Sequence, residues 1–293
     1  MKKVLLIVNP VSGTVKIKSC ILNILDILTS NGCIPTVMIT QRRGHAFDIV
    51  KEHAYNYDQV ICSGGDGTLN EVISGIVSSN LSIPLGYIPL GSTNDFANCM
   101  KIPLNVMKAT ESAIKGELIP IDIGKFENNY FSYIASFGAF TAASYSTPQS
   151  IKNSLGHLAY VLEGIKDLQK ISPIFIKYTV DNQQYSGDYM FGAVMNSTSI
   201  GGIVKLDKSL VDLSDGEFEI LLVKMPKTLN EINKIIVSIA SSNFENNMFD
   251  FFKSSKIEFE FEDDMMWSID GEGIKSDKKV KIQNLSKRIL LIK

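Results

Sequence analysis

Short apolar segments alternate with helical patterns through the first 120 residues, and this alternation constrains the fold more than any other feature of the chain. The strand-like segments are 4–8, 35–40, 59–62 and 85–89, and the helical ones are 17–29, 44–54, 69–79, 94–100 and 106–116. Short strands separated by helices pair mainly in parallel and are covered by helices on both faces. The pattern therefore predicts a three-layer α/β domain with a mainly parallel sheet.

The pattern changes near Leu118, where β-like segments replace the alternation. These segments are 119–126, 130–137, 175–181, 185–197, 217–223, 256–262, 266–269, 279–283 and 288–292, with helical interruptions at 155–170 and 229–241. We therefore predict an α/β domain over residues 1–122 and a mainly β domain over residues 123–286. Because no long linker separates them, we expect the domains to form a cleft, which is a favoured place for a ligand.

The composition excludes several classes of protein. Among 293 residues, 45% are hydrophobic and 20% are charged, which excludes a disordered or fibrous chain. The net charge is −2, so we expect no nucleic-acid partner. No run of about 18 apolar residues occurs, so any membrane contact should be peripheral. The four cysteines form no CxxC pair, which favours buried free thiols in a reducing cytosol.

A glycine-rich motif at 63–68, Ser-Gly-Gly-Asp-Gly-Thr, follows the third apolar segment and opens a helix. Glycines let the backbone approach a bulky ligand, and N–H groups at a helix start favour a phosphate. Asp66, for which we expect no core role, could hold a cation or a ribose hydroxyl. Thr68 could cap the helix or contact a phosphate. The alternative is a glycine-rich turn without a ligand, and the motif is neither a P-loop nor the dinucleotide fingerprint.

Two other polar turns follow apolar segments in the same way, at 9–13 (Asn-Pro-Val-Ser-Gly) and at 89–97. In the second of these turns, Ser92, Thr93 and Asn94 could instead cap the following helix. Thr40 ends the second apolar segment. Because open α/β sheets bind ligands at the carboxyl ends of their strands, we expect all of these residues to converge on one edge of the sheet.

Acidic residues gather at two places in the second half of the chain. Asp212 and Asp215 precede a strand-like segment, and this spacing can place oxygens around Mg²⁺, although a solvated turn would look similar. Asp270 and Glu272 flank Gly271, where they could simply form a hairpin. Alternatively, one of these two acids could accept a proton from a hydroxyl group.

Together these motifs resemble the diacylglycerol kinase catalytic-domain family. The shared segments are 9–13, 64–72, 89–97, the glycine- and aspartate-containing stretch 201–216, and 270–272, in the family's order and spacing. The chain is most similar to the bacterial soluble lipid kinases, of the diacylglycerol kinase and YegS types. Sphingosine and ceramide kinases are more distant relatives.

The resemblance implies a first domain like that of phosphofructokinases and NAD kinases, a C-terminal β-sandwich, and a last strand, 287–293, that can return to the first domain. The ATP-binding residues that it implies are Asn9, Pro10, Val11, Ser12, Gly13, Thr40, Gly64, Gly65, Asp66, Gly67, Thr68, Leu69, Asn70, Thr93, Asn94 and Asp95. It also implies a structural Mg²⁺ at Asp212, Asp215 and the backbone of Glu217. Asp66, Asp95 and Asp122 match positions around a catalytic Mg²⁺, and Glu272 matches the general base, with Asp270 as the competing candidate.

The function that these features predict is ATP-dependent transfer of a phosphoryl group to a hydroxyl of a membrane lipid such as diacylglycerol, in the interdomain cleft. We expect a cytoplasmic enzyme at the inner face of the membrane. The sequence is compatible with a homodimer but does not decide the oligomeric state. The alternatives are an NAD kinase and a nucleotide-binding regulator without turnover. Segments 9–13 and 94–95 argue against an NAD kinase, and a regulator would not need Glu272.

Overall fold

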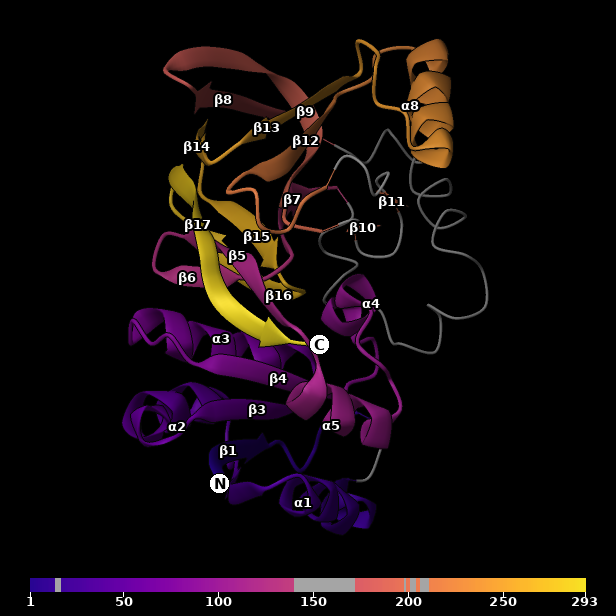
Figure 1. Ribbon diagram of the computed structural model, residues 1–293. Helices are drawn as coiled ribbons and strands as arrows, with labels where there is room; N and C mark the ends of the chain where they lie inside the picture. The colour runs from indigo at the N-terminus through magenta and orange to yellow at the C-terminus, as the bar shows by residue number, and fades with distance from the viewer. Residues whose placement is uncertain (14–16, 140–171, 198, 201–203, 206–210) are drawn as a thin grey trace. The chain divides into compact units, whose positions relative to one another are not determined.

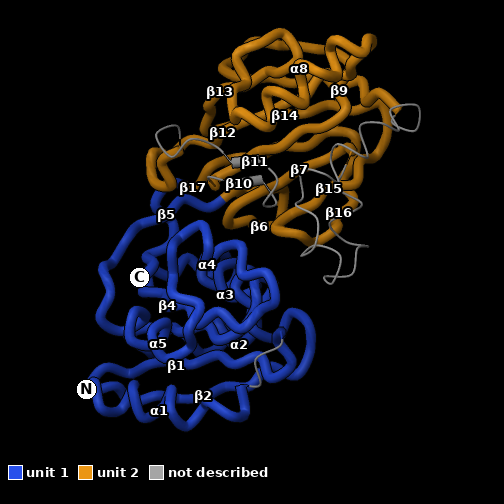
Figure 2. Tube along the Cα trace, turned by 90° about the vertical axis from the view of Figure 1, so that its right-hand side faces the viewer, with its two compact units in different colours: residues 1–123, 286–293 blue, residues 124–285 orange. Residues whose placement is uncertain are grey.

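The computed structural model describes residues 1–13, 17–139, 172–197, 199–200, 204–205 and 211–293 (Figure 1). The chain divides into two compact units, which are drawn in different colours in Figure 2. Unit 1 contains residues 1–123 and 286–293, and unit 2 contains residues 124–285. The α/β pattern of unit 1 and the mainly β pattern of unit 2 confirm the predicted fold class. The helix predicted at 155–170 lies outside the described residues.

Unit 1 contains a parallel sheet in the order β4-β3-β1-β2. Its strands are β1 (Lys2–Val8), β2 (Cys33–Ile39), β3 (Gln59–Gly64) and β4 (Pro84–Pro89). Its helices are α1 (Ile21–Ser30), α2 (His45–His53), α3 (Asp66–Ser78), α4 (Asp95–Met100) and α5 (Val106–Lys115), with short 3₁₀ turns at Ile17–Ser19 and Ala54–Asn56. The apolar residues 4–7 of β1 are fully buried, as expected for a strand that is covered on both faces.

The last strand, β17 (Lys279–Ile292), ends beside β4 in unit 1, where Leu290 to Ile292 pair in parallel with residues 84–86. The sequence predicted two strands here, and that prediction is wrong, because one strand runs through the polar stretch between them. Lys287 adopts a φ of +52°, and its N–H group donates to Oδ1 of Asp122 at 2.6 Å. This contact from β5 (Leu118–Phe126) holds the irregular residue, which no local pattern predicts.

Unit 2 consists mainly of antiparallel strands around an aromatic core. The strands are β6 (Asn129–Phe131), β7 (Ile134–Gly138), β8 (Ile174–Val180), β9 (Gln183–Met195), β12 (Phe218–Lys224), β13 (Phe249–Ser254), β14 (Lys256–Phe261), β15 (Met265–Ile269) and β16 (Glu272–Ser276), with short β10 (Ser199–Ile200) and β11 (Val204–Lys205). Trp267 is fully buried, and its ring centroid lies 4.9 Å from that of Phe126 and 4.7 Å from that of Phe137. These rings fix the centre of the core.

The helix α8 (Leu229–Ser241) has the bounds that its sequence predicts, because Thr228 and Glu231 form a capping box at its start. Other boundaries differ from the prediction. The strands β13 and β16 were not predicted, and the segment 130–137 forms two strands rather than one. Among the described residues, no helix is both long and apolar enough to cross a membrane.

Candidate functional site

The polar turns of unit 1 lie next to one another at the carboxyl ends of the parallel strands, as predicted. The N–H group of Asn9 donates to the Ser63 carbonyl at 2.9 Å, which joins the ends of β1 and β3. The N–H group of Leu90 donates to the Gly64 carbonyl at 2.8 Å, which joins the ends of β3 and β4. Thr40 is buried, and its N–H group donates to Val8 at the end of β1.

Side chains of the first turn hold the glycine-rich turn in place. The Asn9 side-chain amide donates to Oγ1 of Thr68 at 2.8 Å, and the N–H group of Gly65 donates to Oγ of Ser12 at 3.2 Å. The helix α3 begins at Asp66, three residues earlier than predicted, so Thr68 lies inside its first turn. Thr68 is therefore not the helix cap, and that alternative is wrong.

Glycines allow the backbones of the three turns to contact one another. Gly13 has a φ of +57°, and a Cβ atom there would lie 2.0 Å from the Leu90 carbonyl oxygen. A Cβ atom on Gly91 would lie 2.8 Å from the Cα atom of Gly65. Larger residues would therefore push these turns apart. The sequence ascribed the glycines of the motif to a ligand, whereas contacts between the turns already require Gly13 and Gly91 and place Gly65 against Gly91.

Asp66 has a structural contact that the sequence did not predict. Its carboxylate accepts hydrogen bonds from the N–H groups of Asp95 at 3.0 Å and of Phe96 at 3.3 Å, at the start of α4. The side chain of Asn94 instead donates to the Gly91 carbonyl at 2.9 Å. Asp66 thus caps α4, and the expectation that a residue of 92–94 caps this helix is wrong. Burial raises the pKa of the Asp66 carboxyl, and the N–H donors oppose this rise.

Tyr87 of β4 lies within the electrostatic field of the acids at this edge. Its ring packs edge-on against Phe96, with 6.0 Å between the ring centroids, and its buried hydroxyl oxygen has no hydrogen-bond partner in the described structure. Burial raises the pKa of Tyr87, and the negative charges of Asp66 and Asp95 raise it further. The two carboxylates thus act on the same buried hydroxyl.

Two more acids of unit 1 contact backbone of neighbouring segments. Asp122 is fully buried and binds β17 through the N–H group of Lys287, as described above. Glu71 of α3 accepts hydrogen bonds from the N–H groups of Gly44 at 2.7 Å and Ala46 at 3.1 Å. No local sequence pattern marks Glu71 for this role, because its partners lie 25 and 27 residues earlier in the chain.

In unit 2, Asp270 and Gly271 form the two-residue loop of the hairpin β15–β16, which confirms the hairpin. Both have positive φ angles, 46° and 85°, as hairpin loops of this length favour. The buried Asp270 carboxylate accepts hydrogen bonds at 2.7–3.1 Å from the N–H groups of residues 132–134 and from the Ser132 hydroxyl. Burial raises the pKa of Asp270, and these donors oppose the rise.

Glu272 differs from Asp270 in its surroundings. It is the first residue of β16, it pairs with Ile269, and it is exposed. Asp270, by contrast, binds the N–H groups of Ser132 and Tyr133, and these contacts explain why segment 130–137 is interrupted between β6 and β7. The hairpin therefore places one acid in the protein interior and presents the other at the surface.

The predicted metal ligands of unit 2 already have hydrogen-bond donors of the protein as partners. Oδ1 of Asp212 accepts from the N–H and hydroxyl groups of Ser214, both at 3.0 Å. Oδ1 of Asp215 accepts from the N–H group of Glu217 at 3.0 Å, and Oδ2 lies 3.0 Å from Nζ of Lys253. Lys253 thus supplies positive charge to Asp215.

Two further oxygens near this loop also lie close to side-chain nitrogens of the protein. The Glu217 carbonyl accepts from the Asn284 side-chain amide at 3.2 Å. Lys253 lies 3.1 Å from fully buried Glu219, whose pKa is raised to about 7 by burial despite the lysine. Among the described residues, no group of three or more His, Cys, Asp or Glu side chains is arranged to hold a metal ion. The Lys253 ammonium group lies beside Asp215 in this structure, and the Mg²⁺ site at Asp212, Asp215 and the backbone of Glu217 stays a prediction.

Comparison with known proteins supplies independent evidence. Residues 3–126 match the family model described as the diacylglycerol kinase catalytic domain. A Bacillus subtilis protein named diacylglycerol kinase is 32% identical over 276 residues, which are 93% of this chain and 90% of that protein. A Staphylococcus saprophyticus protein of the same name is 31% identical over 273 residues, which are 92% of this chain and 89% of that protein.

A solved structure is similar over nearly the whole chain. The crystal structure of a candidate diacylglycerol kinase from Bacillus anthracis has a TM-score of 0.83 and 26% sequence identity. The match covers 99% of this chain and 96% of that one. Both the α/β segments and the mainly β segments are thus included in the similarity.

Proposed function

This chain belongs to the diacylglycerol kinase family and is a lipid kinase, and from this premise we propose that it transfers the γ-phosphoryl group of ATP to a hydroxyl of a membrane lipid such as diacylglycerol. The observation that carries the proposal is the junction of the three polar turns at the carboxyl edge of the unit 1 sheet. Open α/β sheets bind nucleotides at this edge.

The phosphates of ATP would lie at the start of α3. This helix has 13 residues, and its first N–H groups follow directly on the glycine-rich turn. Backbone N–H groups and the helix dipole favour negative charge at such a position. Asn9 and Ser12 hold the turn in place through Thr68 and Gly65, so the donors keep their arrangement without a ligand. Preorganised donors of this kind stabilise charge on a transferring phosphoryl group.

The acids beside this turn fit the Mg²⁺ that accompanies ATP. Asp66 and Asp95 begin α3 and α4, and the Asp66 carboxylate accepts a hydrogen bond from the N–H group of Asp95, so the two acids start neighbouring helices and offer the hard oxygen donors that Mg²⁺ prefers. Bound Mg²⁺ would supply positive charge to the phosphate oxygens during transfer. Asp66 would hold this ion while it caps α4, so the orientation of the Asp66 carboxylate depends on the position of α4. Asp122 fits an indirect role, since it holds β17.

We propose Glu272 as the general base. The lipid hydroxyl oxygen would attack the γ-phosphorus, its proton would pass to the Glu272 carboxylate, and ADP would leave. Exposure favours Glu272, because an acid that contacts a lipid hydroxyl must be accessible. Asp270 is a weaker candidate, because four hydrogen bonds already engage its buried carboxylate.

The acceptor is a hydroxyl-bearing lipid, so the enzyme must meet it at a membrane surface. We propose peripheral contact at the inner face of the membrane, with no nucleic-acid partner. The family match disfavours an NAD kinase and a regulator without turnover. A homodimer stays a prediction.

The test is turnover with a defined acceptor. Purified protein with ATP and Mg²⁺ should convert diacylglycerol in phosphatidylglycerol vesicles to phosphatidic acid, detected by mass spectrometry. Vesicles without diacylglycerol and reactions with NAD as acceptor are the matched controls. Phosphorylation of NAD, or ATP consumption without a phosphorylated lipid, would contradict the proposal.

A further inference from the structure

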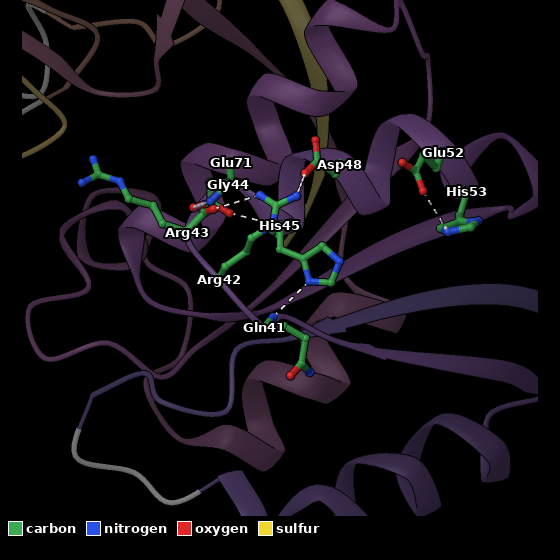
Figure 3. A network of polar contacts seen from close by, with 10 residues as sticks. Gln41, Arg42, Arg43, Gly44, His45, Asp48, Glu52, His53 and Glu71 are labelled. Atoms are coloured by element: carbon green, nitrogen blue, oxygen red, sulfur yellow. Dashed lines mark hydrogen bonds and ion pairs between the residues drawn. The ribbon is translucent and has the colours of Figure 1, made fainter.

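Glu71 makes two contacts that the proposed function leaves unexplained. It lies in the second turn of α3, directly after the glycine-rich turn, and its side chain reaches the start of α2 (Figure 3). Its two oxygens accept hydrogen bonds from Gly44 and Ala46, one oxygen for each N–H group. Hydrogen bonds to a charged acceptor are about twice as strong as neutral ones, so this carboxylate holds the backbone at the start of α2.

We name residues 40–46 the β2–α2 loop, and several contacts besides Glu71 fix its shape (Figure 3). The N–H group of Gln41 donates to Nδ1 of His45 at 3.0 Å. The guanidinium group of Arg42 lies 2.6 Å from Oδ2 of Asp48 and donates to the Arg43 carbonyl at 3.2 Å. The N–H group of His45 also donates to the Arg42 carbonyl at 3.2 Å, so the backbone of residues 41–43 is held at three places although these residues are exposed. This degree of constraint is unusual for an exposed loop.

Close packing of α2 on α3 brings Glu71 within reach of the loop. A Cβ atom on Gly75 would lie 2.7 Å from Cβ of Val50 and 3.1 Å from the Phe47 carbonyl oxygen, so the two helices touch at this glycine. Residues four apart share one face of a helix, which places Glu71 on the side of α3 that faces α2. The contact is thus part of how the two helices pack.

The β2–α2 loop lies at one end of the candidate nucleotide edge. Thr40, at the end of β2, adjoins the end of β1. In the strand order β4-β3-β1-β2, the turn at 9–13 follows β1 and therefore lies between Thr40 and the turns that contain Asp66 and Asp95. A nucleotide with its phosphates at the start of α3 and its metal beside those acids would extend its nucleoside along the edge toward β2. Building on the proposed function, we propose that Glu71 is a positioning residue, which holds the β2–α2 loop in the conformation that receives the nucleoside end of ATP.

The experiment compares Glu71→Ala and Glu71→Gln with Glu52→Gln, a control on α2 whose side chain is 70% exposed. Hydrogen exchange of the amides of Gly44 and Ala46 is measured without nucleotide. Calorimetry gives the Kd for MgATP, and turnover assays with diacylglycerol vesicles give kcat and the KM for ATP. In Glu71→Ala we expect both amides to lose protection and Kd and KM for ATP to rise about tenfold or more. The kcat should change less than about threefold, because the residue does not touch the reacting atoms.

Two outcomes would overturn the proposal for Glu71. Lost protection with an unchanged Kd would mean that the loop does not receive the nucleotide. A raised Kd with intact protection would mean that Glu71 contacts the nucleotide itself. Glu71→Gln keeps the side-chain volume and one acceptor oxygen, so the same measurements on this variant test the proposal if the alanine variant does not fold. A wild-type protein that binds ATP but phosphorylates no lipid would contradict the proposed function alone, since the Kd and exchange measurements still test Glu71.

Discussion

The glycine-rich turn of unit 1 and the acidic hairpin of unit 2 differ in how far the backbone of each depends on distant segments. The turn at 63–68 depends on segments far away in the chain, since Ser12 binds Gly65 and Asp66 binds the start of α4. The backbone of the hairpin loop obtains its shape locally, from two consecutive residues with positive φ and from the pairing of β15 with β16, while its buried acid, Asp270, binds the distant residues 132–134. A change in unit 1 should therefore act on several turns together, whereas the hairpin should tolerate changes at its exposed acid.

The two regions also divide structural and chemical tasks differently. In unit 1, Asp66 both caps α4 and is our candidate for the metal of ATP, so one side chain carries both tasks. In unit 2, the tasks belong to two neighbours, with Asp270 buried and bound to the backbone and Glu272 exposed. This difference predicts that activity and stability change together in unit 1 and separately in unit 2.

The largest effect should come from Asp66→Ala. We expect phosphoryl transfer to fall about 10³-fold, because the carboxylate that would hold Mg²⁺ at the phosphates is lost. The protein should stay folded but lose about 1 kcal/mol of unfolding free energy with the cap of α4. Turnover assays and urea denaturation measure the two quantities. Asp26→Ala, an exposed change on α1, is the control, and near-normal turnover of Asp66→Ala would show that the phosphate-site assignment is wrong.

Glu272→Gln should lower kcat by about 10²-fold or more, because the amide keeps the shape but cannot take the proton. The Kd for ATP and the unfolding free energy should stay as in the wild type, since the side chain is exposed. Glu262→Gln, at another exposed acid of unit 2, is the matched control. A concurrent loss of stability would break the contrast between the two units.

Asp270→Asn should instead act on stability. The amide offers one acceptor oxygen where the carboxylate offers two, so we expect buried N–H groups of residues 132–134 to lose partners at a cost of about 2–3 kcal/mol. Urea denaturation measures this loss, with Asp263→Asn as a control because that side chain is 94% exposed. If the variant is stable but inactive while Glu272→Gln is active, the roles of the two acids are reversed. If both variants keep their activity, the base lies elsewhere.

The smallest effect concerns Mg²⁺ in unit 2. Because Asp215 already pairs with Lys253 and the Glu217 N–H group, we expect Mg²⁺ without nucleotide to leave the unfolding temperature unchanged. Differential scanning calorimetry with and without Mg²⁺ measures this, with Asp215→Asn alongside. A stabilisation by Mg²⁺ that disappears in Asp215→Asn would instead support the metal site that the family resemblance implies.

Much of the fold was predictable because it depends on local patterns. The alternation of apolar and helical segments placed β1 to β4 and their helices within a few residues, and the capping box placed α8. The strand β13, Phe249–Ser254, escaped prediction because its sequence, Phe-Asp-Phe-Phe-Lys-Ser, lacks the regular alternation of apolar and polar residues that marks a half-buried strand. The strand β17 was divided in two because its irregular residue, Lys287, is held by Asp122 from a distant segment.

The sequence predicted which residues belong to the candidate site better than it predicted the groups to which these residues hydrogen-bond. The three turns and the hairpin were expected from glycines and polar residues at strand ends, and they lie where the pattern places them. The contacts of Asp66 with α4 were not expected, since its partners are about 30 residues away. Glu71 was missed for the same reason.

The sequence by itself determined the class of fold, the turns that can approach a phosphate and the acids available for chemistry, because these depend on hydrophobic periodicity, glycine and side-chain type. Only the tertiary structure decided which acid caps α4, which one is buried in the hairpin and which one holds the β2–α2 loop. The physical reason is that a carboxylate is fixed by the N–H groups it meets. Those groups belong to segments whose proximity is set by packing of the whole chain.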